Sequence, residues 1–254
     1  MDLTIVPVDA GRLGGVERST QQYLNGFGEK IHARLTMWLI LGGSEPIVVD
    51  VGAGTPEVVR RRQGRELVQE RDPREVLHAH GVDPAEVRTV LLTHLHWDHC
   101  LGLELGAFPN ATAYVQRREL QYAAAPYPVH ARLYDRAVLH GLEGADGYPA
   151  LRVVDGDVRV APGVRMILTP GHTPGMAAVL VDTAAGTYAI ASDNVPLQSS
   201  WTGRTADAWI PNGIHVDLGD CYRSLARLAA EAAVVLPSHD DSVHQQRRYP
   251  APGA

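Results

Sequence analysis

Residues 93–100 read THLHWDHC and place three histidines and one aspartate within six residues. The apolar run Val90–Leu92 leads directly into this stretch, which predicts a buried strand that ends in a tight turn. In an extended segment alternate side chains share one side, so His94, His96 and Asp98 would point together. His99 would then have to turn towards the same pocket.

This donor set is typical of a transition-metal site. Neutral imidazoles with a carboxylate suit zinc, iron, cobalt or manganese better than calcium or magnesium. The alternative interpretation is that several polar residues share a surface loop, but the spacing of the ligands disfavours it. We therefore expect a metal site where this strand ends.

Composition indicates one globular domain over residues 1–254. Hydrophobic residues make up 45% of the chain and charged residues 20%. The formal net charge is -6 without a block dense in Lys and Arg, so no nucleic-acid partner is expected. No apolar run approaches the roughly 20 residues that span a bilayer, and the first residues do not resemble a signal peptide. Cys100 and Cys221 are too few for a disulfide framework, which favours the cytoplasm.

Short apolar stretches between Gly, Pro and Asp predict a chain rich in strands. Strands are expected at 3–8, 33–41, 47–51, 87–92, 113–116, 151–154, 158–160, 164–168, 177–182, 187–192 and 234–236. Helices are expected at 56–71, 73–80, 117–125 and 219–233. Residues 9–30 show no clear period and could be disordered or fold over a pocket. Residues 126–150 could be a packed insertion or part of a substrate lid, and the polar tail from Gln245 is expected to fray.

Other candidate ligands lie where a strand runs out into a turn. His172 lies between prolines and glycines in Thr169–Gly175, and Asp193 follows the apolar run Ile190–Ala191. His239 follows Leu236 in the same way. One histidine in a loop is usually a polar surface residue, but three further strand-end residues beside an existing cluster favour a shared site.

With these residues the chain resembles the metallo-β-lactamase superfamily of hydrolases. The resemblance covers nearly the whole chain, from an early hairpin ending in Asp50 through the His-x-His-x-Asp-His motif to His172, Asp193 and His239 in the order of that family. It implies an α+β fold, a four-layer αβ/βα sandwich of two mixed sheets with a dinuclear metal site at one edge. It further implies that one metal is held by His94, His96 and His172, and the other by Asp98, His99 and His239, with Asp193 bridging them.

The resemblance also implies a chemistry. Two divalent ions that share a water lower its pKa, so that a hydroxide can attack a carbonyl near neutral pH. Zinc is the expected metal, with iron, cobalt and manganese as alternatives. Asp98 and Asp193 are the expected catalytic carboxylates, which orient or transfer the proton. The expected partner is a small-molecule substrate.

Within the superfamily the chain looks most like the N-acyl-homoserine lactonase and pyridoxolactonase-like branch. The similarity lies in Ser192–Asp193, Gly213–Asp217 and Pro237–Asp240. It implies a lactonase, with quorum quenching as one role. Flavodiiron oxygen reductases usually carry Glu at the position of His96, so hydrolysis is favoured over oxygen reduction.

One position departs from the branch. Quorum-quenching lactonases commonly have a tyrosine three residues after the bridging aspartate, where this chain has Pro196. The residues that could replace its contact with the substrate carbonyl are Tyr222, Trp201 and His215. Trp97 and Tyr122 complete the predicted substrate contacts.

Three other functions are compatible with parts of the pattern. The same site could hydrolyse another carbonyl bond, such as a cyclic amide, an aryl ester or a thioester. A nuclease would share the histidine motif, but the negative net charge and the lack of a basic arm argue against it. A non-catalytic scaffold would usually have lost ligands, and none is missing here. A homodimer is an alternative to a monomer.

Overall fold

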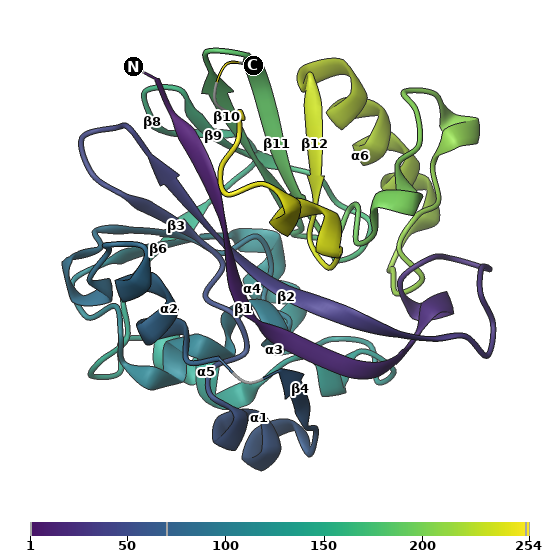
Figure 1. Cartoon of the computed structure of the whole chain (residues 1–254). Helices are drawn as coiled ribbons and strands as arrows, with labels where there is room; N and C mark the ends of the chain where they lie inside the picture. Colours follow the sequence, from purple (N-terminus) through teal and green to yellow (C-terminus); the bar gives the residue numbers. More distant parts are fainter. Residues whose placement is uncertain (1, 70, 252, 254) are drawn as a thin grey trace.

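The computed structural model describes the chain except residues 1, 70, 252 and 254, and it shows two mixed β-sheets packed on each other (Figure 1). The first sheet has the order β4-β1-β2-β3-β5-β6-β7. Its strands are β1 (Thr4–Glu17), β2 (Lys30–Leu41), β3 (Ile47–Val49), β4 (Leu67–Gln69), β5 (Thr89–Leu91), β6 (Thr112–Gln116) and β7 (Ala150–Val154). The second sheet has the order β12-β11-β10-β9-β8. Its strands are β8 (Val158–Ala161), β9 (Val164–Leu168), β10 (Ala177–Thr183), β11 (Gly186–Ser192) and β12 (Val234–Pro237).

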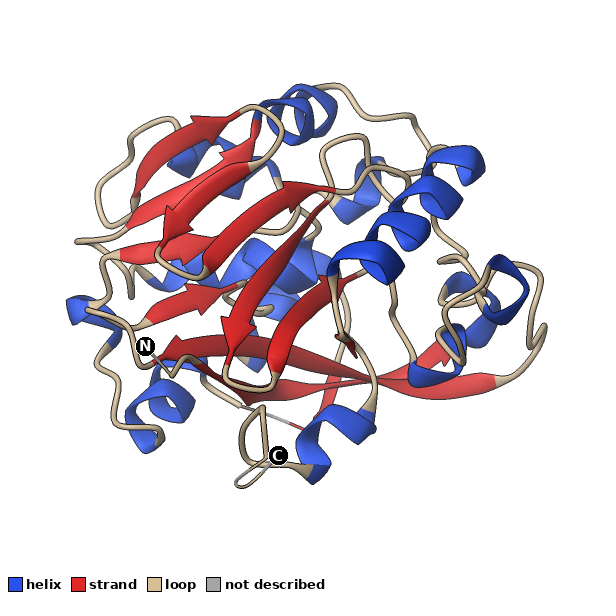
Figure 2. Cartoon of the chain, turned by 90° about the horizontal axis from the view of Figure 1, so that it is seen from above, coloured by secondary structure: helices blue, strands red, loops and turns tan. Residues whose placement is uncertain are grey.

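Helices cover the outer face of each sheet (Figures 1 and 2). The helices α1 (Pro56–Gln63), α2 (Pro73–Ala79), α3 (Trp97–Cys100), α4 (Arg117–Ala124) and α5 (Arg136–Leu142) pack in one apolar core with the first sheet. The helix α6 (Leu218–Glu231) packs on the second sheet in a core of its own. A further core lies between the sheets. The predicted four-layer α+β sandwich is confirmed.

Strand alternation explains how one short strand serves two cores. Val48 of β3 belongs to the core beneath the outer helices, whereas Ile47 and Val49 belong to the core between the sheets. Successive side chains of a strand point to opposite faces, so a strand buried on both faces reads as a continuous apolar run. This run is what made the central strands detectable from the sequence.

The expected loop over residues 9–30 is in part a strand. β1 continues to Glu17 and pairs antiparallel with β2, with register shifts between Asp9 and Arg12 and between Leu13 and Val16. Gly11 has a φ of 120° and Gly15 a φ of 66°, conformations that favour glycine at such bulges. An inserted residue breaks the period of two, and the sequence pattern therefore missed this half of β1.

The continuous helix predicted over 56–71 is wrong. Thr55 caps α1 by accepting from the Val58 N–H at 3.4 Å, and the helix ends at Gly64, which has a left-handed φ of 61°. The chain then pairs with β1 as the edge strand β4. The tail also packs, since Tyr249 exchanges backbone hydrogen bonds with Ile5 at 2.7 and 2.8 Å. Of the tail that was expected to fray, residues 252 and 254 lie outside the described residues.

Parallel strand pairs bring several strand ends to one edge. β3 and β5 are parallel, and so are β11 and β12. Their carboxyl ends therefore leave each sheet in a common direction, and the loops that follow meet between the two sheets.

Candidate metal centre

The loops after β5, β11 and β12 carry most of the predicted metal ligands. Asp193 directly follows β11, and His239 follows β12 after one intervening residue. His172 comes from the turn between β9 and β10. The histidine-rich stretch follows β5, and α3 begins inside it, so that Asp98 and His99 lie on a helical turn. The expected extended conformation therefore does not reach Asp98, and the helical turn brings both side chains to the centre.

The seven predicted ligands converge in overlapping groups. Within each group the ligand atoms lie within 4.8 Å of one another. The groups are His94–His96–His172, His94–His99–Asp193 and Asp98–His99–His239. The first and third are the two sets that the sequence resemblance implied for two metals, and the second joins them.

Asp193 lies between the two sets. Its Oδ1 is 3.0 Å from His239 Nε2 and 3.3 Å from His99 Nε2, while its Oδ2 is 3.4 Å from His172 Nε2. The Ser238 hydroxyl donates to Oδ1 at 2.8 Å, which fixes the carboxylate in this orientation. One carboxylate thus presents one oxygen to each set.

Hydrogen bonds behind the centre orient the imidazoles. Nδ1 of three histidines contacts an oxygen atom away from the centre, which directs Nε2 inward. These contacts are His99 to Asp50 Oδ2 at 2.8 Å, His172 to the Ile214 carbonyl at 2.6 Å and His239 to the Arg34 carbonyl at 2.8 Å.

Asp50 holds the first of these contacts within a buried network. Its carboxylate also accepts from the Thr93 N–H at 2.8 Å and from the Thr93 hydroxyl at 2.8 and 3.0 Å. Asp50 has a φ of 54° and Ser192 a φ of 48°, a left-handed conformation that is uncommon outside glycine. Such strain clusters at functional sites, and here it lies at the ends of two strands that lead to the centre.

The donors fit a metal ion. Nε2 of His94 is buried and has no hydrogen-bond partner among the described residues, and Nδ1 of His96 lies 3.0 Å from Nε2 of His172. A buried nitrogen without a partner is unfavourable unless another group satisfies it. Imidazole nitrogens and carboxylate oxygens at this spacing are the ligands of divalent transition metals, so the cluster is suited to hold such ions.

Burial and the aspartates separate the histidine pKa values. Burial, reinforced by neighbouring imidazoles, holds the pKa of His94 well below its usual value. Burial also lowers the pKa of His96 and of His172. At His99 and His239 burial acts in the same direction, but nearby carboxylates, Asp193 foremost, outweigh it and raise the pKa. The first set therefore favours neutral imidazoles, the form that binds metal.

A family profile includes this whole cluster. The profile described as the metallo-beta-lactamase superfamily matches residues 36–239, from β2 to the last of the seven predicted ligands. The chain belongs to the metallo-beta-lactamase superfamily.

Characterised relatives of this superfamily member include lactonases. An N-acyl homoserine lactonase from a Bacillus species is 32% identical over 164 residues, which cover 59% of each chain. An N-acyl homoserine lactonase of Rhizobium radiobacter is 37% identical over 115 residues, covering 41% of this chain and 40% of its own. The alignments thus span about three fifths or less of these relatives.

Solved structures of lactonases share the fold. A quorum-quenching N-acyl homoserine lactone lactonase superposes with a TM-score of 0.78 at 23% identity, covering 99% of this chain and 98% of its own. An N-acyl homoserine lactone hydrolase with its product N-hexanoyl-L-homoserine at the catalytic metal centre gives a TM-score of 0.77 at 22% identity, covering 96% of each chain. These similarities confirm the metallo-β-lactamase fold.

A narrow cavity of about 80 Å³ opens onto the centre. His96, Asp98, His172, Asp193 and His239 line it from the metal side. Side chains from β1, β2, α3 and four connecting segments form its other walls. The superfamily member thus has access for a small molecule at the metal centre.

Of the predicted substrate contacts, Trp97 lines this cavity. The other four lie outside its lining. Trp201 stacks on Trp209, with ring centroids 5.4 Å apart, and Tyr222 lies on α6 with 37% of its surface exposed. The Tyr122 hydroxyl lies 2.8 Å from Nδ1 of His130. His215 packs edge-on against Tyr23 at 4.7 Å, and its neighbour Ile214 reaches the cavity.

The sequence did not reveal a buried carboxylate beside the centre. Glu119 of α4 has no exposed surface, and it accepts from the Leu95 N–H at 2.9 Å and the Thr173 hydroxyl at 2.5 Å. The Tyr134 hydroxyl donates to it at 3.2 Å. Glu119 therefore ties the loop of His96 to the loop of His172. A Cβ on Gly175 would lie 2.0 Å from Glu119 N, so the second loop needs glycine to approach this closely.

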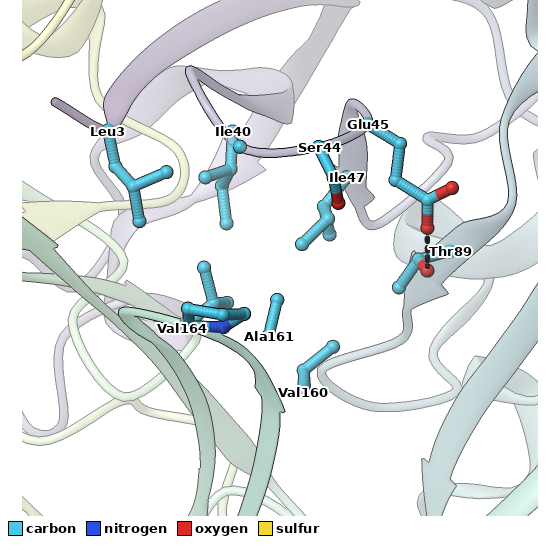
Figure 3. Close-up of a pocket in the computed structure, with 11 residues that line it drawn as sticks. Leu3, Ile40, Ser44, Glu45, Ile47, Thr89, Val160, Ala161 and Val164 are labelled. Carbon is cyan, nitrogen blue, oxygen red and sulfur yellow. Dashed lines mark hydrogen bonds between the residues drawn. The ribbon is translucent and has the colours of Figure 1, made fainter. Parts of the chain in front are cut away.

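A second hollow lies at the opposite edge of the sandwich, where β3 and β5 begin (Figure 3). It has a volume of about 280 Å³ and is walled by apolar side chains such as Leu3, Ile40 and Val164. The Thr89 hydroxyl donates to Glu45 at 3.1 Å on its rim. None of the predicted ligands lines this hollow.

Two further expectations concern the whole chain. Cys100 and Cys221 are both free and buried, in accord with a chain that uses no disulfide framework. Within the part of the chain that the structure describes, no helix is long and apolar enough to cross a membrane.

Proposed function

We propose that this protein is a metal-dependent lactonase that opens a small cyclic ester at a dinuclear site. The orientation of Asp193 supports this most directly, because its two oxygens face two separate groups of histidines. The similarity to curated lactonases supports the ester as substrate. Hydrolysis of an N-acyl homoserine lactone is one form of this activity.

In this proposal each group of ligands holds one ion. His94, His96 and His172 would hold the first, and Asp98, His99 and His239 would hold the second. Asp193 would serve both groups, since one of its oxygens faces each of them. Zinc suits this set of nitrogen and oxygen donors, and iron, cobalt or manganese would also fit.

The chain's own residues then have separate tasks. When bound, two divalent ions polarise an ester carbonyl and lower the pKa of water enough to supply a nucleophile near neutral pH. Asp98 lines the cavity and has 19% of its side chain exposed, so it can take the proton of the attacking water and return it to the leaving oxygen. Asp193, which also lines the cavity, can orient that water.

A comparison of matched substrates tests the reaction. Metal-loaded protein should open lactones of varied ring and tail faster than lactams of the same shape, because the alkoxide of an ester leaves more readily than an amine. Measured rates on both series would separate a lactonase from a hydrolase of other carbonyl bonds. Absence of hydrolysis across the lactone panel would refute the proposal.

Replacement of the bridging residue tests the site. Asp193→Ala should lower the bound metal, measured by elemental analysis, and the lactonase rate together, because both groups lose a ligand. Asp146→Ala is the matched control, since Asp146 is exposed in a distant turn. Retention of both metal and activity in Asp193→Ala would exclude the proposed dinuclear centre.

Location and partners stay predictions. The few cysteines favour the cytoplasm, and the net charge of -6 argues against nucleic acid. A homodimer remains the alternative to a monomer.

A further inference from the structure

The cavity at the metal centre continues into a wider outer hollow. This outer hollow has a volume of about 420 Å³. Trp97, Leu133 and Ile214 line both spaces, and so does Arg65 from the segment between α1 and β4. Because the two spaces share these walls, they form one cleft, whose inner end is the metal centre.

The outer hollow carries more positive than negative charge. Arg65, Arg132 and Lys30 line it, whereas Glu17 supplies a carboxylate. Lys30 Nζ lies 2.7 Å from Glu17, and these two charges cancel. Among the described residues neither Arg65 nor Arg132 has a hydrogen-bond or ion-pair partner.

These two arginines differ from their neighbours in sequence. On the adjacent helix α1, Arg60 pairs with Glu66 at 2.8 Å and Arg61 pairs with Glu104 at 2.6 Å. An arginine guanidinium presents a planar set of donors that matches a carboxylate. Two such groups left unpaired on one hollow, in a chain with a net charge of -6, offer a site for an anion.

Apolar side chains accompany Arg65 in the part of the cleft that both spaces share. Val16, Trp97, Leu133 and Ile214 line the shared part of the cleft. An apolar wall favours a hydrocarbon portion of a ligand, because contact there removes apolar surface from water. The cleft therefore presents metal ligands at its inner end, apolar side chains with Arg65 in the part that the two spaces share, and Arg132 in its outer part.

We propose that the substrate carries a carboxylate, bound by Arg65 with Arg132 beside it, and an apolar spacer that joins this carboxylate to the ester that is hydrolysed. This inference rests on the proposed lactonase function and names its substrate class. A neutral lactone with a purely hydrocarbon tail would leave both guanidinium groups without a partner.

A matched pair of lactones tests this inference. One carries a terminal carboxylate on its side chain, and the other carries the neutral carboxamide in its place. For the wild type, kcat/KM should be about tenfold higher for the carboxylate, as expected for one charge-assisted contact near solvent. The preference should arise in KM and should shrink at high salt, because salt screens exposed charges.

Variants assign the preference to its residues. Arg65→Met should lower the ratio of kcat/KM between the two lactones about tenfold, and Arg65→Lys should retain part of it because the charge remains. Arg159→Met is the control, because it removes the same charge from an exposed position on β8 of the other sheet. Equal kcat/KM values for the two lactones in the wild type, or an unchanged ratio in Arg65→Met, would overturn the inference.

A binding measurement separates this inference from the proposed reaction. If neither lactone is hydrolysed, the lactonase proposal fails, and calorimetry on metal-loaded protein then decides the recognition step. Tighter binding of the carboxylate compound that disappears in Arg65→Met supports the anion site. Equal binding of the two compounds refutes it.

Discussion

Replacing Asp50 by Asn should weaken metal binding although Asp50 is not one of the proposed ligands. The carboxylate accepts from His99 Nδ1 at 2.8 Å and from the Thr93 N–H and hydroxyl. Asn keeps the shape but removes the charge and replaces one acceptor oxygen with an amide donor. His99 then loses the partner that directs its Nε2 to the centre.

The size of the effect follows from the lost contact. Loss of a carboxylate that holds a ligating imidazole typically reduces metal affinity by about 10- to 100-fold, which corresponds to about 1.4 to 2.8 kcal/mol. We expect the upper part of this range, because Asp50 is only 2% exposed and solvent cannot replace the carboxylate. Thr93→Val should have a smaller effect, since it removes one hydroxyl donor and leaves the contact with His99.

Competition with a chelator of known affinity measures this directly. The free zinc concentration at half occupancy should rise in Asp50→Asn and stay constant in Asp146→Asn, which changes an exposed carboxylate. Circular dichroism of the metal-free proteins would show whether the fold is retained. Unchanged zinc affinity in a folded Asp50→Asn protein would refute the role given to this contact.

Two further predictions concern stability. Glu119→Gln should lower the free energy of unfolding of metal-free protein by about 2 kcal/mol in urea titrations, because the new amide faces groups that donate to the carboxylate. Glu66→Gln on the exposed surface is the control. Equal stability of the two variants would contradict the prediction. Burial lowers the pKa of His244 to about 4, so below pH 6.5 the unfolded chain binds a proton that the folded chain does not. Stability should therefore fall between pH 6.5 and 4 by about 3 kcal/mol more in wild type than in His244→Gln, and parallel profiles of the two proteins would exclude this role.

Several of the proposed metal ligands could be predicted from the sequence because they lie where an apolar strand ends. Such strands are buried on both faces, and their apolar runs are visible without any knowledge of the partner strands. His94 and His96 follow β5, Asp193 follows β11 and His239 follows β12 in this way. A sheet edge is a narrow place, so residues that share it can be expected to converge.

The walls of the cleft could not be predicted in the same way. β1 contains two register shifts that break its alternation, and it therefore read as a loop beyond residue 8. β4 is a short edge strand behind Gly64, and the pattern of α1 was extended across it. Arg65 lies in this region, and from the sequence alone it resembles the exposed arginines of α1 that precede it. Glu119 likewise resembles an ordinary acidic residue in the first turn of a helix, and only the approach of the Thr173 loop buries it.

The division of the histidine-rich stretch between two groups is a tertiary property. Residues 93–100 supply donors to both groups, and nothing within the stretch separates His96 from His99. Asp193 comes from the second sheet and divides them, because its two oxygens face opposite ways. The loops that meet here belong to the two sheets, which elsewhere contact each other largely through an apolar core. Polar ligands from both sheets can be kept buried at this edge only while a partner satisfies their nitrogens, so the packing of the sandwich and the chemistry of the centre depend on the same few residues.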